Sequence, residues 1–150
     1  MILDERLEFC DATSAILAVG NAIIGDVVDL KSPTTDPNTT VDLEGSDLYF
    51  VMQVDTTFVG ATSTTKFELS SDSTADLATS RTVHYATAAI PVATLVAGYT
   101  ICAVRLPSGS YERYLGVWET VATANVTAGK VNAFLTSDPA LYRAYADNVG

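Results

Sequence analysis

The sequence predicts an all-β protein, an antiparallel β-sandwich, and we expect its topology to be a jelly roll. Apolar residues in the core segments recur with period two rather than 3.6, and these segments are rich in Val, Ile, Thr, Tyr and Phe. The segments are short and closely spaced, which leaves no room for crossover helices and favours antiparallel pairing. The chain has 150 residues, 48% of them hydrophobic and 17% charged. We therefore expect residues 1–150 to form a single domain with extended N- and C-terminal arms.

Four strands are predicted in the first part of the chain. Residues 23–30 are the first candidate strand. Residues 48–54 are apolar almost throughout, which is typical of a strand buried on both faces. Residues 66–70 alternate between apolar and polar side chains, and residues 81–89 continue that alternation, so both predict strands with one buried face.

A turn, a strand and a loop follow. Residues 90–98 predict a short turn or a single helical turn that ends at Gly98. Residues 99–106 predict another strand. Residues 106–110 predict a loop, because Pro107 fixes φ and Gly109 permits a positive φ.

The last predicted elements form a hairpin. Residues 111–123 predict a long strand, residues 124–129 a turn, and residues 130–135 the returning strand.

Two polar stretches do not fit the sandwich. Residues 31–47 contain Pro33 and Pro37 and predict a long surface loop, a kind of loop that often serves contact with a partner. Residues 137–150 follow the last strand and contain Leu141, Tyr142 and Tyr145. We expect this C-terminal arm either to pack back on its own domain or to reach a neighbouring molecule.

The charge balance and the cysteines restrict the function classes. The net charge of −10 argues against sequence-independent binding to nucleic acid, which needs a basic face. No apolar stretch approaches the roughly 20 residues of a membrane span, and the acidic N-terminal segment does not resemble a secretory signal. We therefore expect a protein made in a cytoplasm, with Cys10 and Cys102 as buried reduced thiols; a disulfide between them is the alternative.

No residue pattern points to catalysis. His84 is the single histidine and lies within a predicted strand, where a structural role is expected, and no Gly-x-Ser-x-Gly motif occurs. The paired carboxylates Glu44 and Asp47, or Asp72 and Asp76, fall in polar loops and are interpreted as solvated charge. We therefore expect no enzyme activity, no cofactor and no metal site.

A carbohydrate- or receptor-binding β-module is the alternative function. Tyr111, Tyr114 and Trp118 could stack on a sugar. Tyr114 and Trp118 share one face of their strand and Tyr111 lies on the other, so the pattern does not form a single aromatic stripe.

Several short segments resemble the Bbp16-type capsid cement proteins of tailed bacteriophages. The resemblance follows the order of the family's segments over nearly the whole chain. It departs at Thr13 and in the expanded loop 31–47. The resembling segments are residues 1–4, 7–12, 27–30, 95–99, 106–109, 112–115 and 127–131.

The resemblance implies a structural virion protein of jelly-roll type. Such a protein would be made in the cytoplasm of the bacterial host and bind the outer surface of an HK97-fold capsid. It would associate with copies of itself as a homodimer or homotrimer and clamp neighbouring major capsid subunits after expansion. We expect Arg113 to pair with a carboxylate on the adjacent strand. The candidate residues for contact with a partner or a second copy are Leu141, Tyr142, Arg143, Tyr145, Arg113 and Tyr114.

Overall fold

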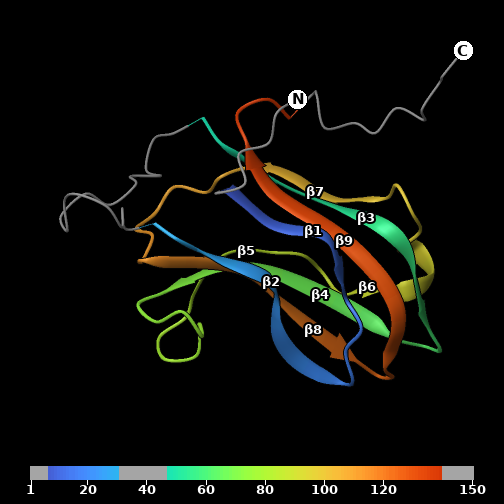
Figure 1. The fold of residues 1–150 in the computed structure, drawn as a ribbon. Coiled ribbons are helices and arrows are strands. Elements are labelled where there is room, and N and C mark those ends of the chain that lie inside the picture. The colour runs from blue at the N-terminus through green and yellow to red at the C-terminus, as the bar shows by residue number, and fades with distance from the viewer. Residues whose placement is uncertain (1–6, 31–46, 140–150) are drawn as a thin grey trace, which may run out of the picture.

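The computed structural model describes residues 7–30 and 47–139. These residues form two antiparallel sheets that pack face to face, as Figure 1 shows. Strands of the first sheet are β1 (Glu8–Ser14), β9 (Val126–Thr136), β3 (Tyr49–Gly60) and β7 (Thr100–Arg105), in that spatial order. The second sheet contains, in order, β2 (Gly20–Asp29), β8 (Tyr114–Ala122), β4 (Thr64–Asp72) and β5 (Thr82–Ala86), and the two-residue β6 (Ile90–Pro91) also pairs with β4. The predicted all-β antiparallel sandwich is confirmed.

Most successive strands lie in opposite sheets, and β4, β5 and β6 lie together in the second. The chain passes from β1 in the first sheet to β2 in the second, back to β3, and on to β4 and β5. The last strand, β9, lies between β1 and β3, and β8 lies between β2 and β4. We interpret this order as a jelly roll, because such a fold winds a pair of antiparallel strands around two sheets of four.

One hydrophobic cluster fills the space between the sheets. Its aromatic members meet edge to face, with ring centroids 6.0 Å apart for Phe9 and Phe50 and 6.4 Å apart for Phe58 and Phe67. Phe50, Met52 and Val54 contribute from β3. The sequence predicted a strand buried on both faces at residues 48–54, where residues 50–52 and 54 are indeed buried, but β3 continues to Gly60 and residues 55–57 are exposed.

The sequence predicted no strand before residue 23, but residues 8–14 form β1 at the edge of the first sheet. Phe9 and Cys10 are adjacent and both buried, so the segment does not show period-two alternation. The physical reason is the irregular register of β1 against β9, which shifts between Glu8 and Cys10 and again before Thr13.

The predicted strand 81–89 is interrupted. β5 ends at Ala86, and β6 resumes at Ile90 further along the same neighbour, β4. At the break, the buried Thr87 donates its N–H to the carbonyl of Phe67 and accepts the N–H of Phe67 on its hydroxyl. The Thr87 hydroxyl thus accepts a hydrogen bond that a backbone carbonyl would accept in a regular strand pair.

The predicted turn 124–129 is too long, because β9 already begins at Val126. Gly129 lies inside that strand with φ +144°, and a Cβ there would stand 2.6 Å from the Phe58 ring. Because Gly129 has no Cβ, the Phe58 ring can pack against the backbone at this position. The glycine therefore serves core packing and does not form the turn. The predicted single turn at residues 90–98 is confirmed as the 3₁₀ helix η2 (Val92–Thr94), with Gly98 at φ +86° after it.

Candidate interaction surfaces

The connections of the sandwich gather at two ends. The β4–β5 and β7–β8 connections lie at one end, at the left of Figure 1, and the β1–β2, β3–β4, β6–β7 and β8–β9 connections lie at the other. We call these the polar end and the uncharged end. The polar end contains Asp47, residues 73–81 and residues 105–114; the uncharged end contains residues 15–21, 56–65, 90–99 and 120–129.

Arg113 anchors the β7–β8 loop at the polar end. Its Nε and Nη2 donate to the two carboxylate oxygens of Asp29, at 3.0 and 2.8 Å. The guanidinium also lies over the ring of Tyr114, 4.8 Å from the ring centroid. The hydrogen bond to Asp29 raises the pKa of Arg113. Since Asp29 ends the adjacent strand β2, the predicted pairing of Arg113 with a carboxylate on the adjacent strand is confirmed.

His84 holds the same loop from the other side. Its Nε2 lies 2.7 Å from the hydroxyl of the buried Ser71, and that hydroxyl also accepts the N–H of Glu112 at 3.1 Å. The imidazole stacks on Tyr111 with ring centroids 4.0 Å apart. The Tyr111 hydroxyl donates to the carbonyl of Pro107, within the loop.

The protonation of His84 follows from this arrangement. Burial lowers the pKa of His84, and the charge of Glu112 acts in the opposite direction. A neutral ring fits the geometry, because Ser71 can donate its proton to Nε2 while it accepts from Glu112. Ser71 is fully buried, so this serine–histidine contact fastens the loop to the sheet.

The interpretation of Asp72 as a solvated charge is wrong. Asp72 is fully buried, and it accepts the backbone N–H groups of Thr74, Thr79 and Ser80 at 2.9–3.3 Å. Burial acts to raise the pKa of Asp72, but the hydrogen bonds from Ser80, Thr74 and Ser73 outweigh it and lower the pKa to about 2. Asp72 thereby folds the β4–β5 loop over the outer face of the second sheet, where Leu77 is buried.

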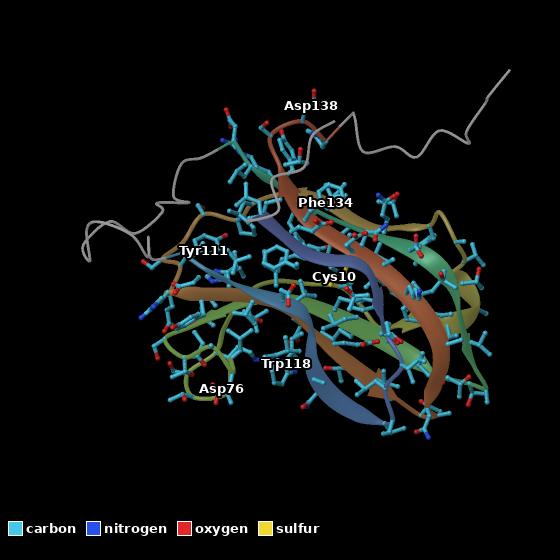
Figure 2. The ribbon with its side chains drawn as sticks, in the orientation of Figure 1. Cys10, Asp76, Tyr111, Trp118, Phe134 and Asp138 are labelled. Atoms are coloured by element: carbon cyan, nitrogen blue, oxygen red, sulfur yellow. The ribbon has the colours of Figure 1, made fainter. Side chains whose placement is uncertain are left out.

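Trp118 lies on that outer face, away from the first sheet (Figure 2). The guanidinium of Arg81 covers one face of its indole, 4.5 Å from the ring centroid. Arg81 is held in turn by Glu68, at 3.1 Å. The indole face that would stack on a sugar is thus occupied by a cation from the chain itself.

Four connections that are distant in sequence are joined at the uncharged end. Asn125 links two of them, since its side-chain oxygen accepts the N–H of Val19 at 3.0 Å and its carbonyl accepts the Ser63 hydroxyl at 2.9 Å. The carbonyl of Ser63 accepts the N–H of Val92 at 3.0 Å, which adds the connection that carries η2. None of the four segments contains an Asp, Glu, Lys or Arg residue.

The uncharged end is also where hydrophobic side chains meet solvent. Of the six large hydrophobic side chains that the described residues expose, all but Val83 belong to its four segments. A groove of about 370 Å³ opens beside them, between the β3–β4 hairpin and residues 91–93. Its walls include Phe58, Val59, Pro91 and Val92. The exposed residues are Ile16 (61%), Val19 (56%), Val59 (53%), Val96 (48%) and Tyr99 (36%).

The remaining predicted contact residues, Leu141, Tyr142, Arg143 and Tyr145, lie outside the described residues, as do residues 31–46 of the predicted loop. Asp47, at the end of that loop, accepts a hydrogen bond from Arg105 at 2.7 Å.

Both cysteines are free and buried, as predicted. Burial raises the pKa of each thiol to about 12. Residues 7–30 and 47–139 contain no cluster of three or more His, Cys, Asp or Glu side chains that could hold a metal ion, and no helix there is long and apolar enough to span a membrane.

Sequence analysis missed the uncharged end. Its residues come from four connections, and only the strand order shows that these meet. The available signal was the absence of charge from four separate segments of an acidic chain.

Comparison with known proteins gives one family. The model of the family described as Bbp16 matches residues 12–135, from β1 to the penultimate residue of β9. Among curated proteins, no match was found.

Proposed function

The chain belongs to the Bbp16 family, and from this membership we propose that it is a structural virion protein that cements a phage capsid. It binds the outer surface of an HK97-fold shell and holds neighbouring major capsid subunits together after expansion. The sequence resemblance to capsid cement proteins supports this role. The strongly acidic composition agrees with a position outside the shell, away from packaged DNA.

The structural observation that carries the proposal is the chemical difference between the two ends of one sandwich. The polar end presents Arg113 with Asp29 and Arg105 with Asp47, whereas the uncharged end presents Val59 and Ile16. A cement protein must make two contacts at the same time. A sandwich with two different contact surfaces is suited to that task, and we assign the polar end, with Arg113 and Tyr114, to the major capsid protein.

The mechanism is mass action. A protein that binds only the expanded lattice stabilises that lattice by its binding free energy. Copies that bridge neighbouring subunits multiply a modest free energy per contact, because each second attachment occurs at a high effective concentration. No covalent bond is made or broken in this process.

The direct test is the protein inventory of purified virions, quantified against the major capsid protein. We expect a copy number comparable with that of the major capsid protein, and release of the chain before the shell breaks when virions are heated. A few copies per particle would indicate the tail or fibre module instead, and complete absence from virions would overturn the proposal.

A second measurement separates capsid binding from mere presence in the particle. Purified protein is mixed with expanded shells that lack it and with unexpanded shells, and the bound fraction is measured by co-sedimentation. We expect binding to expanded shells alone. Equal binding to both forms would contradict the cementing mechanism, since such a ligand cannot favour either lattice.

A further inference from the structure

We propose that the outer edge of β7 binds an extended segment of the major capsid protein, which adds to the first sheet as a further strand. β7 lies at the edge of that sheet, beside β3 (Figure 1). The inference rests on the proposed function, because that function supplies the partner. It also extends the assignment of the polar end, since β7 enters that end at Arg105.

The backbone of β7 is paired on one side only. The N–H of Leu106, which continues the register of β7 against β3, donates to the carbonyl of Leu48 at 2.8 Å. Residues of an antiparallel strand turn their backbone groups toward the same neighbour at every second position, so the even-numbered residues of β7 face β3. The odd-numbered residues turn their N–H and C=O groups to the other side, where no strand of the described residues lies. These residues are Ile101, Ala103 and Arg105.

The other three sheet edges are protected against such pairing. β1 and β2 each contain two acidic residues and a shifted register, and the two strands contact each other. The register of β5 against β4 shifts at His84. Charged residues and irregular pairing are the usual means by which edge strands avoid adding a further strand.

β7 has neither form of protection over most of its length. Its register against β3 is regular from Cys102 to Arg105. Arg105, its last residue, is its only charged residue, and the guanidinium of Arg105 donates to Asp47 at 2.7 Å. The three outward-facing residues are therefore open to regular strand pairing.

The geometry of this edge defines the chemistry of the partner. N–H donors and C=O acceptors recur at every second residue, about 6.8 Å apart, and an extended polypeptide carries complementary groups at the same spacing. On the inner side of the edge, Val104 and Tyr85 are half-buried and pack against the core. Tyr85 comes from β5 and meets the ring of Phe50, which is opposite Val104 in register, at 6.4 Å between centroids. An added strand with hydrophobic side chains facing inward would cover both.

Charge and position favour the capsid subunit over a second copy. Two copies of this chain each have a net charge of −10 and repel each other, and β7 offers only Arg105 to offset that repulsion. The polar end, which we assign to the major capsid protein, begins at the same residue. One capsid subunit can therefore contact Arg113 and the edge of β7 together.

The test is hydrogen exchange of the full chain, free and bound to expanded shells that lack it. The N–H groups of Ile101, Ala103 and Arg105 should exchange rapidly in the free chain and at least about tenfold more slowly in the bound chain, because strand pairing protects them. The amides of Cys102 and Val104 face β3, so they should be protected in both states.

Two matched variants test the same edge by co-sedimentation with expanded shells. Ala103 on β7 and Ala86 on β5 are both exposed, and both have an N–H that faces away from the neighbouring strand. Proline there removes an outward donor and leaves the existing ladder in place. Ala103→Pro should weaken shell binding by about tenfold or more, whereas Ala86→Pro should bind as the wild type does. Circular dichroism and the thermal midpoint first establish that each variant folds. If Ala103→Pro misfolds, the hydrogen exchange of the wild type decides the question.

Three outcomes would overturn the inference and leave the proposed function standing. One is a chain that binds expanded shells while its outward β7 amides still exchange rapidly. Another is a folded Ala103→Pro variant that binds shells as tightly as the wild type. The third is slow exchange of these amides in the free chain, since the chain itself or a second copy would then occupy the edge. Failure of the wild type to bind expanded shells would overturn the proposed function, and this inference with it.

Discussion

Glu119 faces the core of the sandwich from β8, between Val117 and Val121 on the same side of the strand. Its side chain is almost fully buried, and its Oε1 has no hydrogen-bond partner among the described residues. Burial raises the pKa of Glu119 to about 8. The folded chain therefore holds this carboxyl as a neutral acid at and below neutral pH.

Stability should fall as pH rises toward 8 because of Glu119. Its pKa is higher in the folded chain than the ordinary value of 4.5, so its stabilising contribution is complete below pH 4.5 and is lost as pH rises through about 8. Glu119→Gln keeps the size and removes the titration. Urea unfolding midpoints between pH 5 and 9 should decline for the wild type and decline less for Glu119→Gln. Parallel profiles for the two proteins would contradict this account.

His84 titrates in the opposite sense. Burial lowers its pKa, so the neutral ring stabilises the fold above the ordinary value of 6.5, and that contribution is lost as pH falls through the lower pKa of the folded state. Because the chain has one histidine, a single imidazole resonance in the NMR spectrum reports this pKa. We expect a value below 6.5.

Ser71→Ala should raise the pKa of His84, because the serine hydroxyl stabilises the neutral ring by donating to Nε2. Thr82→Val is the control. It removes a hydrogen bond of 3.2 Å to Glu112 and leaves the Ser71–His84 contact in place, so it should change the pKa less. A lower pKa of His84 in the Ser71→Ala variant would show that Nε2 carries the proton and donates it to Ser71 in the wild type.

At the scale of the strand, β2 bends where β1 crosses it. Gly25 has φ +75°, and a Cβ there would lie 2.1 Å from the carbonyl oxygen of Phe9. The register of β2 against β8 shifts between Ile24 and Val28, just after this position. Glycine is thus required both for the backbone conformation and for the close approach of β1.

Gly25→Ala and Gly98→Ala separate these two requirements. Gly98 also has a positive φ, of +86°, but a Cβ there meets nothing within 4 Å. We expect Gly98→Ala to cost about 1–2 kcal/mol of unfolding free energy, from conformation alone. Gly25→Ala should cost about 3 kcal/mol or more, because the clash with Phe9 adds to it. Equal costs in urea unfolding would show that β1 can move away from β2.

The sequence predicted most strands because period-two alternation reports which residues face the core. It missed β1, whose irregular register breaks the alternation, and it misplaced the turn before β9, because Gly129 serves packing against Phe58. The pairing of Arg113 with a carboxylate of the adjacent strand was predicted from its place in the expected strand 111–123, although β8 begins only at Tyr114 and Arg113 lies just before it. The partners of His84 were not, because Ser71 and Tyr111 reach it only through strand pairing.

At the scale of the whole molecule, charge and hydrophobic exposure are separated. The acidic and basic side chains lie outside the four segments of the uncharged end, and five exposed hydrophobic side chains lie within them. This separation leads to opposite salt dependences for contacts made through the two ends of the sandwich. A contact made by ion pairs weakens when salt screens them, whereas an uncharged contact between two acidic copies strengthens as their repulsion is screened.

Any self-association through the uncharged end should therefore tighten severalfold when ionic strength rises from 20 to 300 mM. Over this range the Debye length falls from roughly 20 Å to roughly 6 Å, so the repulsion between two copies of net charge −10 is largely removed. Sedimentation equilibrium in sodium chloride and in sodium fluoride distinguishes screening, which depends on ionic strength alone, from salting-out, which differs between the anions. Weaker association at high salt would mean that ion pairs join the copies, and the contact would then lie at the polar end.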